Sequence, residues 1–373
     1  MPDLPQDILT CIVEVVSDPK TLWALLTVSR HISGVAILAI YGELSIDSRN
    51  STEYINRVPK YILTLQKLAR TARSNRNLRL TTSFTFFGFD PHDVQDTFAQ
   101  AILPRLSNLR RLEINTPHID PKTLWLLPRR VKLTHLILYT VTYSKHFIRF
   151  LDSQPNLRLL SVSMFQKPPV PGSTEQPLPP AIPLSPSALP QLRSLEAPTR
   201  AIPQFSHRDT VVDLTFTSNA WGERNAPFPI EVRDALVTGF RSVRGVYFPH
   251  PIDFEGIAFV IRELPNLQYF GMDTSAIAFP LPWHLLAATP LKYIQFGDIL
   301  QLDFAAEIAA DVFNSIPSVD VLDVYQDGYG ERRVFQRFCR HAPEGISAQI
   351  YRTQWQVWWE PVAREIHEIC ANH

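Results

Sequence analysis

The sequence has few cysteines, few glycines and no long apolar run, and each shortage argues against a class of protein. The three cysteines, Cys11, Cys339 and Cys370, form no Cys-x-x-Cys pair, so we expect neither a disulfide framework nor a zinc knuckle. Only 13 glycines in 373 residues leave little material for phosphate-binding loops. The apolar run VAILAIY is too short to span a bilayer. These shortages predict an intracellular protein, in the cytoplasm, the nucleus or both.

The sequence also has no excess of positive or of negative charge. Lys+Arg and Asp+Glu both number 36, which argues against binding to nucleic acid or to a membrane through bulk charge. These totals leave a local basic patch open as an alternative, although the sequence does not indicate one. No basic region followed by an apolar run opens the chain, so we expect no signal peptide.

Catalytic motifs are missing as well. The ending HEICANH places His367 and His373 too far apart for the paired histidines of a metalloprotease helix. The sequence contains no Gly-x-Ser-x-Gly, Gly-x-Gly-x-x-Gly or Walker pattern. We therefore predict that the protein is not an enzyme and that it needs no metal or other cofactor.

What the sequence does contain, from about residue 100 onward, is a repeated arrangement of three apolar residues. Its starts are Leu109, Leu133, Leu157, Leu192, Val211, Val243, Leu267, Leu291 and Val319. In each copy the second apolar residue follows three positions later and the third two positions after that. Several starts lie 24 residues apart, within the roughly 20–29 residue period of leucine-rich repeats. The last two apolar positions alternate as in a strand, and stretches such as SKHFIRFLDS predict helices between the strands.

The pattern resembles that of leucine-rich-repeat proteins. The resemblance implies an α/β solenoid over residues 48–330, a horseshoe with parallel strands on its concave face. A doubly wound α/β sheet is the alternative, but its buried strands would be continuously apolar. The turn position that usually carries asparagine holds Pro117, Val141 and Arg200, and only Asn219 matches. We therefore expect irregular repeats without a continuous asparagine ladder.

Two segments differ in character from the repeats. Residues 166–190 are so rich in proline that they predict an exposed, mobile loop, which is either a tolerated insertion or a ligand for a proline-reading module. Residues 331–373 are expected to cap the last repeat, because Trp355, Trp358 and Trp359 have helical spacing.

Residues 1–47 predict three short helices, with Pro5 and Pro19 in first turns and Asp18 as a helix cap. So few residues cannot build a large core, and we expect apolar surface to remain for a neighbour. The Leu-Pro opening, Asp-Ile-Leu, Asp-Pro-Lys-x-Leu and Val-Ser-Arg follow one another as in an F-box, which this segment resembles. It departs from the family at Ile32, where many F-boxes carry tryptophan.

The F-box resemblance implies a substrate-recognition subunit that binds a Skp-type adaptor and, through it, a cullin–RING ubiquitin ligase. The adaptor contacts that it implies are Leu4, Pro5, Ile8, Leu9, Ile12, Leu22 and Leu25. The alternative is a leucine-rich-repeat scaffold with no ligase role, in which the same helices only cap the repeats.

A target protein is predicted to bind the concave face of the C-terminal repeats. There the strand positions between the buried residues hold Tyr247, Tyr269, Tyr293 and Tyr325, and tyrosine is enriched in binding hot spots. Tyr269 and Tyr293 share one register, so we expect their rings to lie side by side. Asp273 and Asp323 flank this stripe and suggest a target with a basic feature. The alternative is that the tyrosines only cover neighbouring strands.

Overall fold

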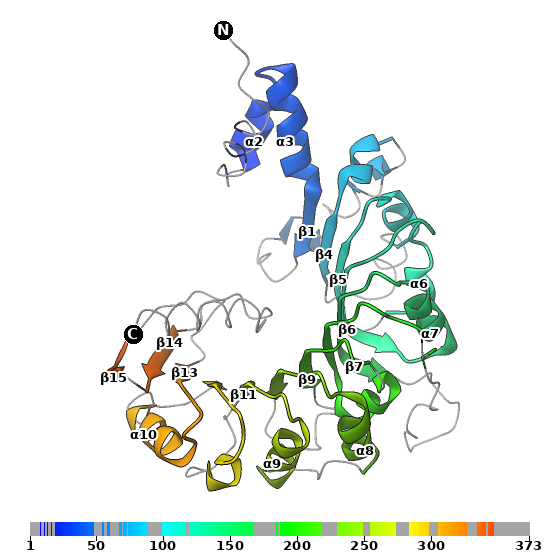
Figure 1. Cartoon of the computed structure of the whole chain (residues 1–373). Helices are drawn as coiled ribbons and strands as arrows, with labels where there is room; N and C mark the ends of the chain where they lie inside the picture. The colour runs from blue at the N-terminus through cyan, green and yellow to red at the C-terminus, as the bar shows by residue number, and fades with distance from the viewer. Residues whose placement is uncertain are drawn as a thin grey trace. The chain divides into compact units, whose positions relative to one another are not determined.

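The protein forms two compact units, Met1–Gln191 and Leu192–His373, each described by itself. The computed structural model describes part of each unit (Figure 1). The described residues are 8, 11, 13, 16, 19–47, 54–55, 58–59, 67–68, 70–72, 74–88, 99–116, 119–166, 184–185, 187–206, 208–217, 230–248, 254–273, 283–297, 305–326, 334–340 and 342–346.

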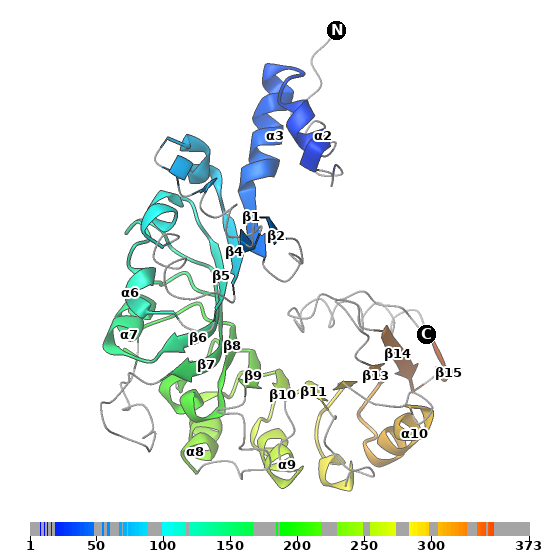
Figure 2. The same cartoon turned by 180° about the vertical axis from the view of Figure 1, so that it is seen from behind.

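The first unit begins with helices. α2 (Pro19–Leu25) and α3 (Arg30–Gly42) pack side by side, and residues 8, 11 and 13 before them are helical (Figures 1 and 2). The Ser29 hydroxyl accepts a hydrogen bond from the backbone N–H of Ile32, which caps the start of α3. The helical piece has only a small core, centred on Val13 and Val35.

A parallel sheet follows in the first unit. In its described part, five strands pair in the order β1 (Glu43–Asp47), β4 (Ser83–Phe87), β5 (Arg111–Asn115), β6 (His135–Thr142) and β7 (Leu159–Gln166). Two very short strands, β2 (Tyr54–Ile55) and β3 (Val58–Pro59), form a separate hairpin. The helical connections on the outer side of the sheet are η1 (Arg76–Leu80), η2 (Leu103–Arg105), α6 (Pro121–Leu124) and α7 (Lys145–Asp152).

The second unit repeats this arrangement. Its described parallel strands are β8 (Ser194–Pro198), β9 (Asp213–Thr217), β10 (Gly245–Phe248), β11 (Tyr269–Asp273), β12 (Tyr293–Gly297) and β13 (Val321–Gln326). Two antiparallel strands follow, β14 (Val334–Cys339) and β15 (Ala342–Ile346). The connections are η3 (Thr199–Phe205), α8 (Ile230–Gly239), α9 (Phe254–Glu263), η4 (Trp283–Leu286) and α10 (Ala305–Ser315).

The repeat pattern predicted from the sequence is confirmed. The nine residues that start the pattern are each at most 1% exposed. Equivalent positions pair between strands, as Leu112 does with Leu136 and Leu136 with Leu160. One apolar row therefore runs across the strands of each unit and packs against the helical connections, which is the leucine-rich-repeat arrangement.

Backbone hydrogen bonds join successive repeats at the start of each strand. The carbonyl of Arg244, for example, accepts from the N–H groups of Gln268 at 2.8 Å and Tyr269 at 2.9 Å. We call this series of doubly accepting carbonyls the carbonyl ladder. Its members are Thr82, Arg110, Thr134, Arg193, Val212, Arg244, Gln268 and Lys292. Because both partners are backbone groups, the ladder does not need asparagine side chains at the turns.

Some boundaries differ from those expected from the sequence. β1 lies inside the expected helical segment 1–47, yet it pairs with β4 in the sheet. The repeat that contains β4 was missed because Thr81, not an apolar residue, occupies its first position, where it is fully buried. β14 and β15 extend the sheet into the expected cap, 331–373. The three tryptophans proposed for that cap lie outside the described residues.

The expectation of an exposed proline-rich loop over 166–190 is wrong at its C-terminal end. Leu184, Ala188 and Leu189 are at most 5% exposed, while residues 167–183 lie outside the description. Leu189 has a φ of 53°, a left-handed conformation that costs an L-residue about 1–2 kcal/mol. Burial of a leucine side chain contributes about 1.5–3 kcal/mol, so packing offsets this cost.

The buried row should carry much of the stability of the second unit. We expect Leu291→Ala to lower the free energy of unfolding by about 2–5 kcal/mol, because Leu291 is fully buried. Leu285→Ala is the matched control, since Leu285 is 38% exposed, and should change it by about 0.5 kcal/mol. Urea denaturation of both variants checks this. Equal losses would show that the repeat pattern does not define the core.

Candidate functional site

The residues between the buried apolar ones point to the other side of each strand, away from the helices. We call this side the polar face. In the second unit it bears Tyr269 and Gly271 from β11, Tyr293 and Gln295 from β12, and Asp323 from β13, in paired register. Figure 1 shows α8, α9 and α10 on the opposite side of these strands. The polar face is the candidate site for a target protein.

Tyr269 and Tyr293 lie side by side, as predicted. They are paired residues of β11 and β12, and their ring centroids are 6.5 Å apart with the planes inclined by 55°. Their environments differ, because Tyr293 is fully buried and Tyr269 is half-buried. Burial raises the pKa of Tyr269, Arg244 opposes that rise and Asp213 adds to it. The hydroxyl of Tyr269 is therefore neutral at neutral pH.

Tyr293 and Asp323 belong to a buried polar network. The hydroxyl of Tyr293 donates to Oδ2 of Asp323 at 2.8 Å, and the guanidinium of Arg337 donates to both carboxylate oxygens at 2.7 Å. Asp323 and Arg337 are cross-strand partners in β13 and β14 and are 0% and 4% exposed. The negative charge of Asp323 is thus neutralised inside the protein. It does not flank an open tyrosine stripe, as the sequence had suggested.

The side-chain amide of Gln295 lies beside this network but is hydrogen-bonded less fully than its other members. The distance from the Tyr293 hydroxyl to Oε1 of Gln295 is 3.3 Å, but a hydroxyl has one proton, and the shorter contact to Asp323 takes it. The amide Nε2 of Gln295 is buried without a hydrogen-bond partner in the part of the chain that the structure describes. An amide held in this way is a local cost to the fold of about 1–3 kcal/mol.

The structure gives less information on the other expected target contacts, Tyr247, Tyr325 and Asp273. Tyr247 is on the polar face, but it pairs with Gly271 and not with Tyr269, and it is only 8% exposed. Tyr325 and Asp273 belong to β13 and β11, but their side chains lie outside the description. Tyr269 is therefore the most accessible described member of the predicted stripe.

The first unit presents different chemistry on its polar face. Arg111 and Glu113 form an ion pair at 2.9 Å. Burial lowers the pKa of His135, and the charges of Arg111 and Arg158 lower it further. Protonation of His135 is thus disfavoured in the folded state. The fold therefore loses stability as the pH falls from the pKa of His135 in the unfolded chain to its lower pKa in the folded protein. The described part of this face has no paired tyrosine rings.

The expected adaptor contacts in the N-terminal helices fall into three groups. Ile8 is 44% exposed, as a contact residue should be. Leu22 and Leu25 are partly buried and pack against Val13 and Val35, so they stabilise the helical piece itself. The remaining four, Leu4, Pro5, Leu9 and Ile12, lie outside the described residues. Ile32, which replaces the usual tryptophan, also packs on this small core.

Sequence reasoning missed three exposed apolar side chains in the same segment. Trp23, Val28 and Leu38 are 53%, 61% and 49% exposed. Trp23 lies between Leu22 and Leu25 on α2 but faces away from the core that they contact. Trp23 and Leu38 are helical residues outside the buried stripe, and Val28 lies in the turn between α2 and α3.

Among the described residues, no group of three or more His, Cys, Asp or Glu side chains could hold a metal ion. No described helix is both long enough and apolar enough to cross a membrane. The absence of enzymatic activity stays a prediction.

Neither family models nor curated proteins show a match to this chain. Among solved structures, the chain is similar to an internalin (inlF) from Listeria monocytogenes str. 4b F2365, with 15% identity and a TM-score of 0.39. The match covers 74% of this chain and 79% of the internalin. The assignment to the leucine-rich-repeat class therefore depends on the periodic buried row and the strand register of the chain itself.

The buried network predicts a large effect of Arg337→Met. The change would leave the Asp323 carboxylate buried without its ionic partner, so we expect a loss of about 3–5 kcal/mol in the free energy of unfolding. Arg111→Met is the control, because Arg111 is 31% exposed in its ion pair and should cost about 1 kcal/mol or less. Chemical denaturation measures both. Similar small losses would mean that the buried pair does not form.

Proposed function

We propose that the protein is the substrate-recognition subunit of a Skp–cullin–F-box type ubiquitin ligase. In this proposal the polar face of the repeats holds a target protein, and the N-terminal helices bind a Skp-type adaptor. The ligase then supplies the chemistry, so this chain needs no catalytic group or cofactor. The alternative function is a leucine-rich-repeat scaffold that binds partners without any ligase.

The exposed apolar side chains of the N-terminal helices carry the adaptor half of the proposal. Ile8, Trp23, Val28 and Leu38 are each between 44% and 61% exposed within one small helical piece. Exposed apolar residues are unremarkable when scattered singly, but a group of them on a small domain indicates a protein-binding surface. Tryptophan is the residue most enriched in binding hot spots. The order of the F-box motifs in the sequence supplies the identity of the proposed partner.

The target half rests on the polar face of the second unit. Tyr269 offers a half-buried ring and a neutral hydroxyl beside Tyr293, which suits a hot spot of protein recognition. Tyr293 and Asp323 are no longer proposed as direct target contacts. Their hydrogen-bond network with Arg337 instead joins β12, β13 and β14 beneath this surface. Tyr247, Tyr325 and Asp273 stay predicted contacts at the margins of this surface.

A cytoplasmic or nuclear setting belongs to the same proposal. The described cysteines, Cys11 and Cys339, are not joined in a disulfide, which suits a reducing compartment. The ubiquitin ligases to which F-box proteins belong act in such compartments. The proposed partners are the adaptor, through it the cullin–RING ligase, and a target protein.

The adaptor proposal is tested with the double variant Ile8→Ser and Trp23→Ser in the full chain. We expect binding to a purified Skp-type adaptor to weaken at least about tenfold, equivalent to 1.4 kcal/mol, because two apolar anchors are lost. Ile230→Ser with Val237→Ser is the matched control. Both residues are exposed on α8 of the second unit, and the control should bind like the wild type. Isothermal titration measures the affinities.

Two results would contradict the proposal. Wild-type protein that shows no binding to the adaptor would favour the scaffold function. Equal weakening by the control variant would mean that the effect is not specific to the N-terminal helices. Circular dichroism of both variants establishes that the repeats remain folded.

A further inference from the structure

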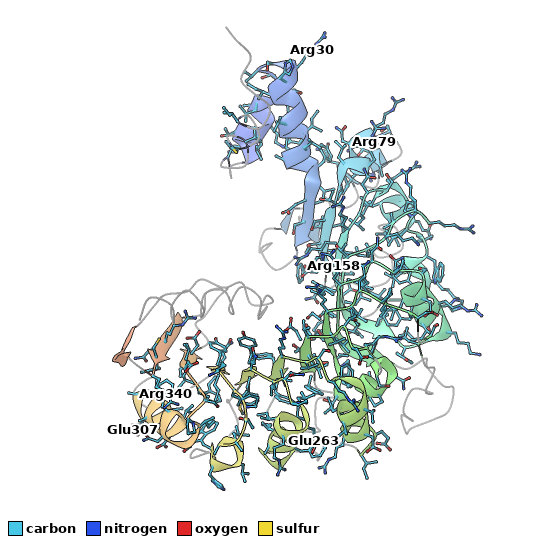
Figure 3. The ribbon with its side chains drawn as sticks, in the orientation of Figure 1. Arg30, Arg79, Arg158, Glu263, Glu307 and Arg340 are labelled. Carbon is cyan, nitrogen blue, oxygen red and sulfur yellow. The ribbon has the colours of Figure 1, made fainter. Side chains whose placement is uncertain are left out.

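The outer helical side of the first unit carries a concentration of positive charge. Residues 67–166 contain 15 Lys or Arg and 6 Asp or Glu, although the whole chain has 36 of each class. Figure 3 shows side chains with nitrogen tips protruding along this outer side. The exposed cations on α6, the following turn and α7, together with Trp125, form what we call the basic patch: Lys122, Trp125, Arg129, Arg130, Lys145 and Arg149.

Trp125 is fixed at the centre of the basic patch. α6 and α7 pack against each other, and the indole Nε1 of Trp125 donates to the backbone carbonyl of His146 at 3.2 Å. The indole also meets the ring of Phe150 edge-on, with centroids 6.0 Å apart. Trp125 nevertheless stays 46% exposed, and the adjacent Leu126 is 37% exposed. The patch thus has a rigid apolar centre that is already oriented for contact.

The cations around this centre are not used within the described structure. Among the described residues, none of the five cationic side chains of the patch takes part in an ion pair. Asp120 caps α6 by accepting from the N–H of Lys122, and Asp152 ends α7. Asp120 and Asp152 are thus two acids on these elements against the five cations of the patch, which leaves an excess of positive charge there.

The placement of Lys145 is also locally unfavourable. α7 begins at Lys145 and has no acidic residue in its first turn, although the helix dipole favours negative charge there. The expected penalty is a few tenths of a kcal/mol at an exposed site. A sequence that departs from local preference in this way often does so where a surface has a function.

We infer that the basic patch binds an acidic segment of a partner protein. Arginine and tryptophan are the residues most characteristic of binding hot spots, and carboxylates complement the five cations. A nucleic acid or an anionic membrane is less suitable, because the chain as a whole has no excess of positive charge.

This inference is independent of the proposed ligase function. The basic patch lies on the outer helices, whereas the proposed target and adaptor surfaces are the polar face and the N-terminal helices. A second partner could therefore be bound on this side whether or not the protein recruits a ligase.

The experiment measures binding of a fluorescent peptide that alternates glutamate with leucine to the full chain, by fluorescence anisotropy at low salt. Replacing Lys122, Lys145 and Arg149 together by Gln should weaken binding about tenfold or more. Replacing Arg76, Arg79 and Arg241 by Gln removes the same charge from exposed sites elsewhere and should have little effect. Trp125→Ala should weaken binding, whereas Leu285→Ala should not.

Several outcomes would overturn the inference. One is equal weakening by the two triple variants, which would indicate only a general effect of charge. Another is retention of binding when glutamine replaces glutamate in the peptide. A third is tighter binding of an oligothymidylate, or of phosphatidylserine vesicles, than of the acidic peptide, which would assign the patch to nucleic acid or to lipid. Melting curves of all variants exclude loss of folding as the cause.

Discussion

The structure of both units depends on a single backbone arrangement, the carbonyl that accepts two N–H groups from the next repeat. In the second unit, the carbonyl of Arg193 accepts from the repeat of β9, that of Val212 from β10, and that of Arg244 from β11. Since the bonds involve no side chain, the ladder positions can hold arginine, threonine, valine, glutamine or lysine. The fold therefore constrains the buried apolar row tightly, while it leaves the side chains at the ladder positions free to vary.

Two arginines complete the last parallel repeat. The backbone N–H of Arg340, directly after the antiparallel β14, donates a single hydrogen bond to the carbonyl of Asp320. Its guanidinium donates to the carbonyls of Val319, Phe313 and Ile316 and lies 5.1 Å from the ring centroid of Phe313. Arg337 meanwhile neutralises the buried Asp323. The guanidinium of Arg340 thus supplies a donor to the Phe313 carbonyl in the last turn of α10, where backbone carbonyls lack partners within the helix.

Local patterns in the sequence were sufficient for the repeats but not for their surroundings. The buried roles of Leu109 and Leu267 follow from a short pattern that recurs, and the contact of Tyr269 with Tyr293 follows from their shared register. The burial of Asp323 could not be predicted, because its partner Arg337 lies on an antiparallel strand that the pattern does not include. The repeat at β4 was missed because Thr81 is polar. Trp23 was overlooked because its neighbours, Leu22 and Leu25, fitted the helical stripe better.

The most direct test of this account is to measure, by NMR of the intact protein, the hydrogen exchange of the amides that donate to the carbonyl ladder. The N–H groups of Gln268 and Lys292 lie before their strands, yet the ladder predicts that they exchange as slowly as Phe270 and Ile294 within the strands. Exchange of the ladder donors at the rates of an unstructured peptide, beside protected strand amides, would contradict the shared-carbonyl arrangement and the repeat register that depends on it.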